Sequence, residues 1–223
     1  MFSTSNILDT LRLDSTGFFL KDLHAERTFE TYQILGLKTD LNSILRIYDQ
    51  VEEKLIKNFL KPQKVRLIFN EATLDYHVQT EKLDAMLNNP IRLQLTTMAT
   101  QKAGIGAGNY KWEDRSYWTQ LLSQKHDKID DIISMNTNNE VTETSRFNIF
   151  IYSPDHDAVY TPNLESGCIN GVYRRFIFQT QKIDLPSLGR KSVYEKTLTA
   201  SDLKQATIFV ANSVRGVIRA TFI

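Results

Sequence analysis

The sequence has little of several things that mark whole classes of protein. Its single cysteine, Cys168, cannot form an internal disulfide, and one thiolate is too few for a cysteine-based zinc site. Nine glycines and five prolines in 223 residues are fewer than average, which excludes collagen-like and linker-rich chains. The four histidines form no HxxxH or HExxH group, so we expect no metal site.

Charge and hydropathy exclude further classes. Lys and Arg number 27 against 26 Asp and Glu, a net charge of +1, whereas nucleic-acid binders are usually strongly basic. No stretch approaches the roughly 18 apolar residues of a membrane span. The N-terminal segment lacks the basic start and apolar run of a secretory signal. We therefore expect a cytoplasmic protein that binds neither nucleic acid nor membrane.

The apolar period changes along the first half of the chain. Helical spacing predicts a helix over 23–35 and a second one that Asp40 or Asn42 would cap and that ends near residue 60. Alternating patterns then predict paired strands at 64–69 and 73–78 and a strand at 91–97. Three glycines at 104, 106 and 108 favour a linker, because their GxGxG spacing is not that of a dinucleotide loop.

The second half is rich in strands. We expect a helix over about 114–125, a hairpin of 131–135 with 140–152, a helix over 172–179, and a short helix capped by Ser201 and Asp202. Mixed helices and strands predict an α+β or α/β chain. The expected domains are a small one over 1–100, a linker over 101–110 and a larger one over 111–223.

Three local features suit the binding of a charged group. Strand alternation places Glu143 on an apolar face, where a lone carboxylate is costly, so it needs a partner. The partner is either a bound group or, in the simpler interpretation, an arginine, unless Glu143 lies at a frayed strand start. His24 and Arg27 share one face of a helix. Gly171 opens a helix whose first backbone N–H groups suit a phosphate, although the same pattern is also an ordinary helix start.

Taken in chain order, the motifs resemble the class IV aminotransferase family, the fold-type IV enzymes that use pyridoxal 5′-phosphate (PLP). The resemblance covers nearly the whole chain. The matching segments are ILDTLR at 7–12 (similar to an ETxR strand, with Asp9 for Glu), HAER at 24–27 (HxxR), KWEDRS at 111–116, VTE…NIF at 141–150, YTP at 160–162, GVYR at 171–174 and Asn212-Ser213.

This resemblance implies a two-domain fold, with a small α/β N-terminal domain and a larger, β-rich, barrel-like C-terminal domain that includes helices. It implies that Lys111 is the catalytic residue and forms the internal aldimine with PLP. Lys102 is a competing candidate, but the spacing from Lys111 to Glu143 suits the family better. Glu143 would pair with the pyridine nitrogen and keep it protonated.

The resemblance also assigns the phosphate of PLP to a set of residues. Arg27 would bind it with a charge-assisted hydrogen bond. The backbone amides of Val172 and Tyr173, which follow Gly171, would add the donors of a helix N-terminus. The loop of Asn212 and Ser213 would complete the cofactor site.

The reaction that the resemblance favours is that of an aminodeoxychorismate lyase, which converts 4-amino-4-deoxychorismate to 4-aminobenzoate and pyruvate in folate biosynthesis. Arg115, four residues after Lys111, and the Asn212-Ser213 pair are the lyase-like features. The alternatives are an aminotransferase acting on D-amino or branched-chain amino acids, and a PLP-binding relative without turnover.

Substrate contacts are expected from a separate set of residues. Thr10, Arg12 and Arg215 are candidates, and either Arg66 or Arg92 would substitute for the arginines that bind the substrate carboxylate in D-amino-acid transaminases. The chain starts at the ETxR-like strand, so the resemblance implies a shortened N-terminus. It also implies a homodimer and a small-molecule amine or amino-acid substrate.

Overall fold

The computed structural model describes residues 5–83, 90–101 and 109–223, which form two compact units. Unit 1 comprises Met1–Met86 and Lys111–Asp114, and unit 2 comprises Leu87–Tyr110 and Arg115–Ile223. The division falls after residue 86, ahead of the expected boundary at 100, and the segment that begins at Lys111 returns to unit 1. The glycines at 104, 106 and 108 lie outside the described residues. Among the described residues, no helix is both long and apolar enough to cross a membrane.

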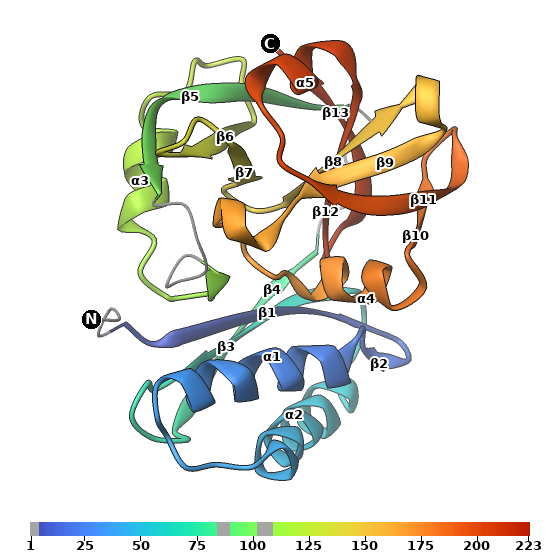
Figure 1. The fold of residues 1–223 in the computed structure, drawn as a ribbon. Helices are drawn as coiled ribbons and strands as arrows, with labels where there is room; N and C mark the ends of the chain where they lie inside the picture. Colours follow the sequence, from blue (N-terminus) through green and yellow to red (C-terminus); the bar gives the residue numbers. More distant parts are fainter. Residues whose placement is uncertain (1–4, 84–89, 102–108) are drawn as a thin grey trace. The chain divides into compact units, whose positions relative to one another are not determined.

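Unit 1 is an antiparallel four-stranded sheet, in the order β2-β1-β3-β4, with two helices on one face (Figure 1). Alternation along β1 turns its odd-numbered residues toward the helices, where they join a core that includes Tyr32 of α1 and Tyr48 of α2. The elements are β1 (Ile7–Asp14), β2 (Gly17–Phe18), α1 (Lys21–Ile34), α2 (Leu41–Ile56), β3 (Gln63–Phe69) and β4 (Tyr76–Lys82).

Local polar bonds set the element ends in unit 1. The Asp40 carboxylate accepts the Ser43 N–H at 2.9 Å, so Asp40 caps α2, one of the two residues expected to do so. Strand β4 starts at Tyr76 and not at residue 73, because the Asn70 side chain accepts the N–H groups of Ala72 and Thr73 at 2.9 and 3.0 Å and folds that segment into a turn.

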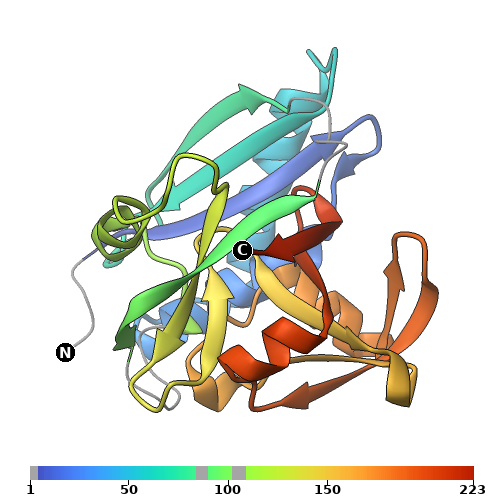
Figure 2. The same ribbon diagram turned by 90° about the horizontal axis from the view of Figure 1, so that it is seen from above.

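Unit 2 is built on a nine-stranded mixed sheet, in the order β10-β11-β9-β8-β12-β13-β5-β6-β7. Figure 2 shows β5 running beside β13, with which it pairs in parallel. The strands are β5 (Ile91–Gln101), β6 (Asp131–Asn136), β7 (Val141–Thr144), β8 (Asn148–Ser153), β9 (Ala158–Pro162), β10 (Lys182–Leu185), β11 (Gly189–Lys196), β12 (Thr207–Asn212) and β13 (Gly216–Phe222). The α-helices are α3 (Ser116–Leu122), α4 (Val172–Thr180) and α5 (Ala200–Gln205).

At β8 both faces of the sheet are buried, as the alternation along this strand shows. Ile149 and Ile151 lie in a cluster with Leu203 of α5. Phe150, between them in the sequence, lies in a second cluster with Ile177 of α4. Helix α4 is therefore fixed on one face by apolar burial, which also fixes the position of the turn that precedes it.

Two sequence expectations for unit 2 need correction, and one hairpin is an addition. The single strand expected over 140–152 is two strands, because Thr144 Oγ1 accepts the N–H groups of Arg146 and Phe147 at 3.3 and 3.0 Å and interrupts the ladder. Helix α5 is capped by Thr199, in a capping box with Asp202, and not by Ser201. The hairpin of β10 and β11 was not predicted.

Candidate active site

In unit 1 the candidate residues gather around the carboxylate of Asp9. Strand β1 directs Asp9 toward α1, and His24 and Arg27, three residues apart on that helix, both bond to it. His24 Nδ1 lies 2.9 Å from each carboxylate oxygen, and Arg27 Nη2 donates to Oδ1. Asp9 and His24 are both 0% exposed. The predicted pairing of His24 and Arg27 on one helix face is confirmed, with Asp9 as their shared acceptor.

Tyr48 of α2 is the fourth member of this cluster. Its hydroxyl donates to Asp9 Oδ2 at 2.6 Å and lies 2.8 Å from Thr28 Oγ1. Burial, together with the negative charge of Asp9, raises the pKa of Tyr48 well above its ordinary value, so the hydroxyl keeps its proton. Tyr48 lies 39 residues from Asp9 in the sequence, and no local pattern could have linked the two.

Electrostatics fix the protonation states in this cluster. Burial by itself would raise the pKa of Asp9, but its neighbours His24, Arg27 and Lys111 hold that pKa well below the usual range. Burial lowers the pKa of His24, against the raising effect of Asp9. The ring is thus neutral, its Nδ1–H donates to Asp9, and its buried Nε2 has no hydrogen-bond partner among the residues that the structure describes.

Asp9 should make the free energy of unfolding depend on pH. Its folded pKa is depressed, so its contribution is complete above the unfolded pKa of about 3.9 and is lost as pH falls below it. We expect Asp9→Asn to lower the free energy of unfolding by about 3 kcal/mol at pH 7, because Arg27 keeps a buried charge without its partner. Urea unfolding measures the free energy of unfolding of wild type and variant at pH 7 and in steps below pH 4. The difference between the two should shrink as the pH falls. A difference that stays constant with pH would contradict this assignment.

The Lys111 backbone is tied to the strand that carries Asp9. The Leu8 N–H donates to the Lys111 carbonyl at 2.9 Å, and the Glu113 N–H donates to the Asn6 carbonyl at 2.8 Å. The charge of Lys111 also contributes to the low pKa of Asp9. The structure therefore brings Lys111, Arg27 and His24 to one carboxylate. The competing Lys102 lies outside the described residues, so the choice between the two lysines stays a prediction.

The expected substrate residues of β1 lie on the other face of its sheet. Thr10 and Arg12 alternate with the buried residues of the strand. Arg12 places its guanidinium carbon 4.2 Å from the Phe19 ring centroid, and its Nε lies 3.6 Å from Asp14 Oδ2. Thr10 is directly paired with Arg66 of β3, so these two share that face. The unit-1 structure does not bring Thr10 or Arg12 to the Asp9 cluster.

In unit 2, Glu143 occupies β7 and is 6% exposed. Its Oε1 accepts the Ile169 N–H at 3.2 Å, so the buried carboxylate is met by a backbone donor, a partner that none of the sequence alternatives foresaw. Burial and the charge of Glu143 raise the pKa of the adjacent Cys168 to about 12, which leaves that thiol protonated and unreactive. The carboxylate thus lies next to the turn that leads into α4.

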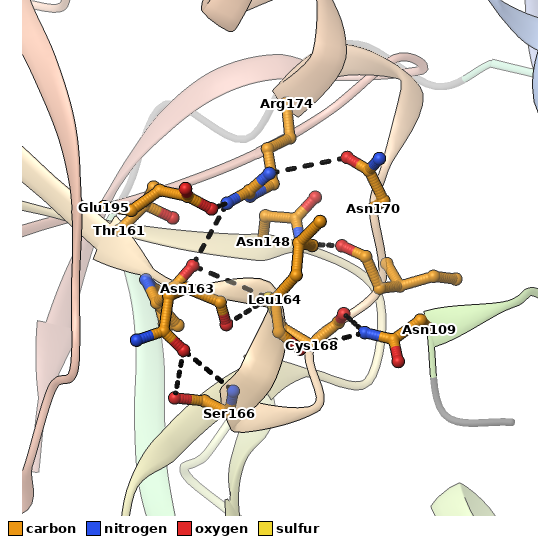
Figure 3. Close-up of polar contacts among 12 residues, drawn as sticks. Asn109, Asn148, Thr161, Asn163, Leu164, Ser166, Cys168, Asn170, Arg174 and Glu195 are labelled. Carbon is orange, nitrogen blue, oxygen red and sulfur yellow. Dashed lines mark hydrogen bonds and ion pairs between the residues drawn. The ribbon is translucent and has the colours of Figure 1, made fainter. Parts of the chain in front are cut away.

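That turn is held by side chains from β8 and from the segment before α3 (Figure 3). Asn148 Nδ2 donates to the Ile169 carbonyl at 2.9 Å, and Asn109 Nδ2 donates to the Cys168 carbonyl at 2.7 Å. Gly171 is the N-cap of α4, and a Cβ built on it would lie 2.3 Å from Asn148 Oδ1. Its φ of −62° suits any residue, so close approach and not backbone strain requires glycine here.

Asn212 is the last residue of β12, and Ser213 and Arg215 lie in the turn between β12 and β13. Asn212 Oδ1 accepts the N–H groups of Val214 and Arg215 at 3.0 and 2.7 Å, and its Nδ2 donates to the Arg146 carbonyl at 3.0 Å. The Asn212 side chain therefore shapes the turn that presents Ser213, which is buried. Sequence reasoning could not distinguish this supporting position from a direct contact with the cofactor.

The chemistry of these residues fits PLP. The cofactor carries an aldehyde, an anionic phosphate and a basic ring nitrogen, and the chain offers a lysine amine, an arginine, a glycine-opened helix N-terminus and a buried carboxylate. A side chain at Gly171 would collide with Asn148 Oδ1, so the turn before α4 packs closely against β8 only because the residue is glycine. Among the described residues, no group of three or more His, Cys, Asp or Glu could hold a metal ion.

Comparison with known proteins gives one family. The model of the family described as "Amino-transferase class IV" matches residues 6–223. A comparison with curated protein sequences gives no match.

Solved structures share the fold. A presumed amino-acid aminotransferase from Mesorhizobium loti is 21% identical, with a TM-score of 0.83 and coverage of 98% of this chain and 99% of that chain. A hypothetical aminotransferase from Mycobacterium tuberculosis in its PLP-bound form is 16% identical, with a TM-score of 0.81 and coverage of 98% and 81%. The 4-amino-4-deoxychorismate lyase from Pseudomonas aeruginosa is 14% identical, with a TM-score of 0.77 and coverage of 98% and 83%.

Proposed function

Because the chain belongs to the class IV aminotransferase family, we propose that it eliminates pyruvate from 4-amino-4-deoxychorismate and forms 4-aminobenzoate. The protein is a PLP-dependent enzyme with the fold-type IV architecture. Its family acts on small-molecule amino-acid substrates. We further propose that it acts in the cytoplasm, as a homodimer, in folate biosynthesis.

The observation that carries the lyase proposal concerns the segment directly after Glu143. Arg115 Nη2 donates to the Ser145 carbonyl at 2.5 Å, and Asn212 Nδ2 donates to the Arg146 carbonyl at 3.0 Å. Arg115 and Asn212 are the residues in which the chain resembles the lyases. Both therefore donate to carbonyls of consecutive residues, two and three positions after Glu143. This supports a common role in shaping the site around Glu143.

Each proposed residue has its own chemical task. PLP, when bound, supplies an electron-withdrawing ring that stabilises negative charge on the substrate. The Lys111 amine would bind the cofactor and take the proton from the substrate carbon next to nitrogen. The C–O bond to the enolpyruvyl group then breaks, and a proton delivered to the methylene carbon of that group gives pyruvate. Glu143 would accept a hydrogen bond from the protonated ring nitrogen.

The phosphate would be bound by two kinds of donor, an arginine side chain and the N–H and hydroxyl groups of a turn and a helix N-terminus. Arg27 uses one N–H group on Asp9 and keeps other donors for an anion. Val172 and Tyr173 contribute the first backbone N–H groups of α4, and Ser213 contributes its hydroxyl. Fixed donors of this kind bind an anion without having to reorganise first.

The reaction itself separates the leading function from its alternatives. Purified protein loaded with PLP should release pyruvate and 4-aminobenzoate from 4-amino-4-deoxychorismate, measured by a coupled lactate dehydrogenase assay and by fluorescence. Transfer of the amino group from D-amino or branched-chain amino acids to 2-oxoglutarate, without pyruvate release, would favour the aminotransferase. Failure of both assays in protein with bound PLP would favour the relative without turnover.

We propose that Arg66, and not Arg92, binds the substrate carboxylate. Arg92 is already neutralised, since its Nε and Nη2 each lie 3.0 Å from a carboxylate oxygen of Asp130. Arg66 is half-buried beside Thr10 and has no ion-pair partner among the residues for which the structure gives side chains. A free guanidinium is the group suited to bidentate recognition of a carboxylate.

This choice makes a paired kinetic prediction. Arg66→Ala should raise KM for the carboxylate substrate about 10-fold, because a hydrogen bond to a charged group is lost, with a smaller change in kcat. Arg92→Ala, the matched control, should leave KM at the wild-type value. Steady-state kinetics of the two variants decide the assignment, and the reverse pattern would transfer the role to Arg92.

A further inference from the structure

The backbone of Ile169 is held at both its N–H and its carbonyl by buried side chains of β7 and β8. Its N–H donates to Glu143 Oε1 at 3.2 Å, and its carbonyl accepts from Asn148 Nδ2 at 2.9 Å. Asn148 begins β8 and is 5% exposed. Figure 3 shows its amide directed at the chain that leads from Cys168 to α4. The residue just before the phosphate-binding turn therefore cannot rotate without breaking one of these bonds.

Asn148 also limits which residue type can occupy position 171. The same amide oxygen that would lie 2.3 Å from a Cβ at Gly171 belongs to the side chain that holds Ile169. The Gly171 N–H in turn donates to the Ile169 carbonyl at 2.9 Å, so this carbonyl receives donors from both Asn148 and Gly171. The three residues form one interlocked unit immediately before the first turn of α4.

We propose that Asn148 is a positioning residue that acts through Gly171 to hold the α4 N-terminus in the conformation that binds the cofactor phosphate. The proposal rests on the assignment of the phosphate to the turn at Gly171–Tyr173. Asn148 does not touch the phosphate itself. Its effect is confined to the part of the affinity that the phosphate contributes, because the bonds it makes are to the turn.

The first test compares PLP with pyridoxal, which lacks the phosphate. Dissociation constants are measured on the apoenzyme by quenching of tryptophan fluorescence. Asn148→Ala should weaken PLP binding about 10-fold, the equivalent of one hydrogen bond, and leave pyridoxal binding unchanged. A general structural defect would weaken both ligands by the same factor and would overturn the proposal. Asn148→Ser gives the same test if the alanine variant does not fold.

The second test is a double-mutant cycle. Gly171→Ala in the wild-type background should weaken PLP binding at least about 10-fold, because its Cβ displaces Asn148. In the Asn148→Ala background, where the obstructing amide is gone, the same substitution should cost much less. Additive effects of the two substitutions would show that the clash does not couple them and would overturn the proposal.

A matched control is available in the same region. Asn163 caps the short 3₁₀-helix Leu164–Ser166, where its Oδ1 accepts the Ser166 N–H at 2.8 Å, and in the described structure it makes no hydrogen bond with Ile169 or Gly171. Asn163→Ala should leave the ratio of the pyridoxal and PLP dissociation constants at the wild-type value. If wild type itself fails to prefer PLP, the phosphate assignment fails together with this inference. If wild type prefers PLP and Asn148→Ala keeps that preference, only this inference fails.

Discussion

Replacing Lys111 with alanine should lower kcat by about 10³-fold or more, the largest effect of any single substitution in this protein. The Lys111 amine is the proposed group for both the attachment of the cofactor and the transfer of the proton. The fold should survive, because the hydrogen bond between Lys111 and β1 is made by its backbone carbonyl, which alanine keeps. The measurement is kcat with saturating PLP, with the thermal midpoint as the check on folding.

Two further observations separate this role from a structural one. Added methylamine should restore part of the activity of Lys111→Ala, since a small amine can replace the missing proton carrier but cannot repair a misfolded site. Lys102→Ala should keep the wild-type rate. Full activity in Lys111→Ala, or loss of activity in Lys102→Ala alone, would move the catalytic role to Lys102.

Glu143→Gln should lower kcat about 100-fold, the second largest effect. Glutamine keeps a side-chain oxygen that can accept the Ile169 N–H, so the turn before α4 should stay in place. What the substitution removes is the negative charge that would keep the pyridine nitrogen protonated. The pH dependence of kcat is measured with PLP bound. It should change if Glu143 controls the protonation of the ring nitrogen, and it should not change if Glu143 has only a structural role.

A neighbouring glutamate provides the matched control for that substitution. Glu140 lies three residues earlier, outside the strand, and its Oε2 accepts a hydrogen bond from Asn136 Nδ2 at 2.6 Å. Glu140→Gln should leave kcat and its pH profile unchanged. If Glu143→Gln behaves like Glu140→Gln, the proposed contact of Glu143 with the ring nitrogen is wrong.

The parts of the fold that the sequence predicts are those with local causes. The cap of α2 at Asp40 and the start of α4 after Gly171 follow from residues within a few positions of each other. The β10–β11 hairpin escaped prediction because its outer residues are polar and because β11 pairs in parallel with β9, a partner distant in the sequence. The break between β7 and β8 depends on one hydroxyl, that of Thr144.

In the candidate site too, features with local causes can be predicted, and contacts between distant residues cannot. The pairing of His24 with Arg27 is visible from helical spacing, whereas their shared acceptor, Asp9, lies on another element. Tyr48 reaches the same carboxylate from 39 residues away. Asn148 was seen only as part of a strand motif, and its contact with Ile169, 21 residues on, emerges only when β8 and α4 pack. Sequence patterns identify residue types suited to PLP, but not the side chains that hold them in place.

The most direct test of this account is the site of covalent attachment of the cofactor. Borohydride reduction of the PLP-loaded protein, followed by proteolysis and mass spectrometry, locates the pyridoxyl label on a single lysine. We predict the label on the peptide that contains Lys111, and its loss in Lys111→Ala. A label on Lys102 or on any other lysine, or no label at all after loading with PLP, would contradict the central claim.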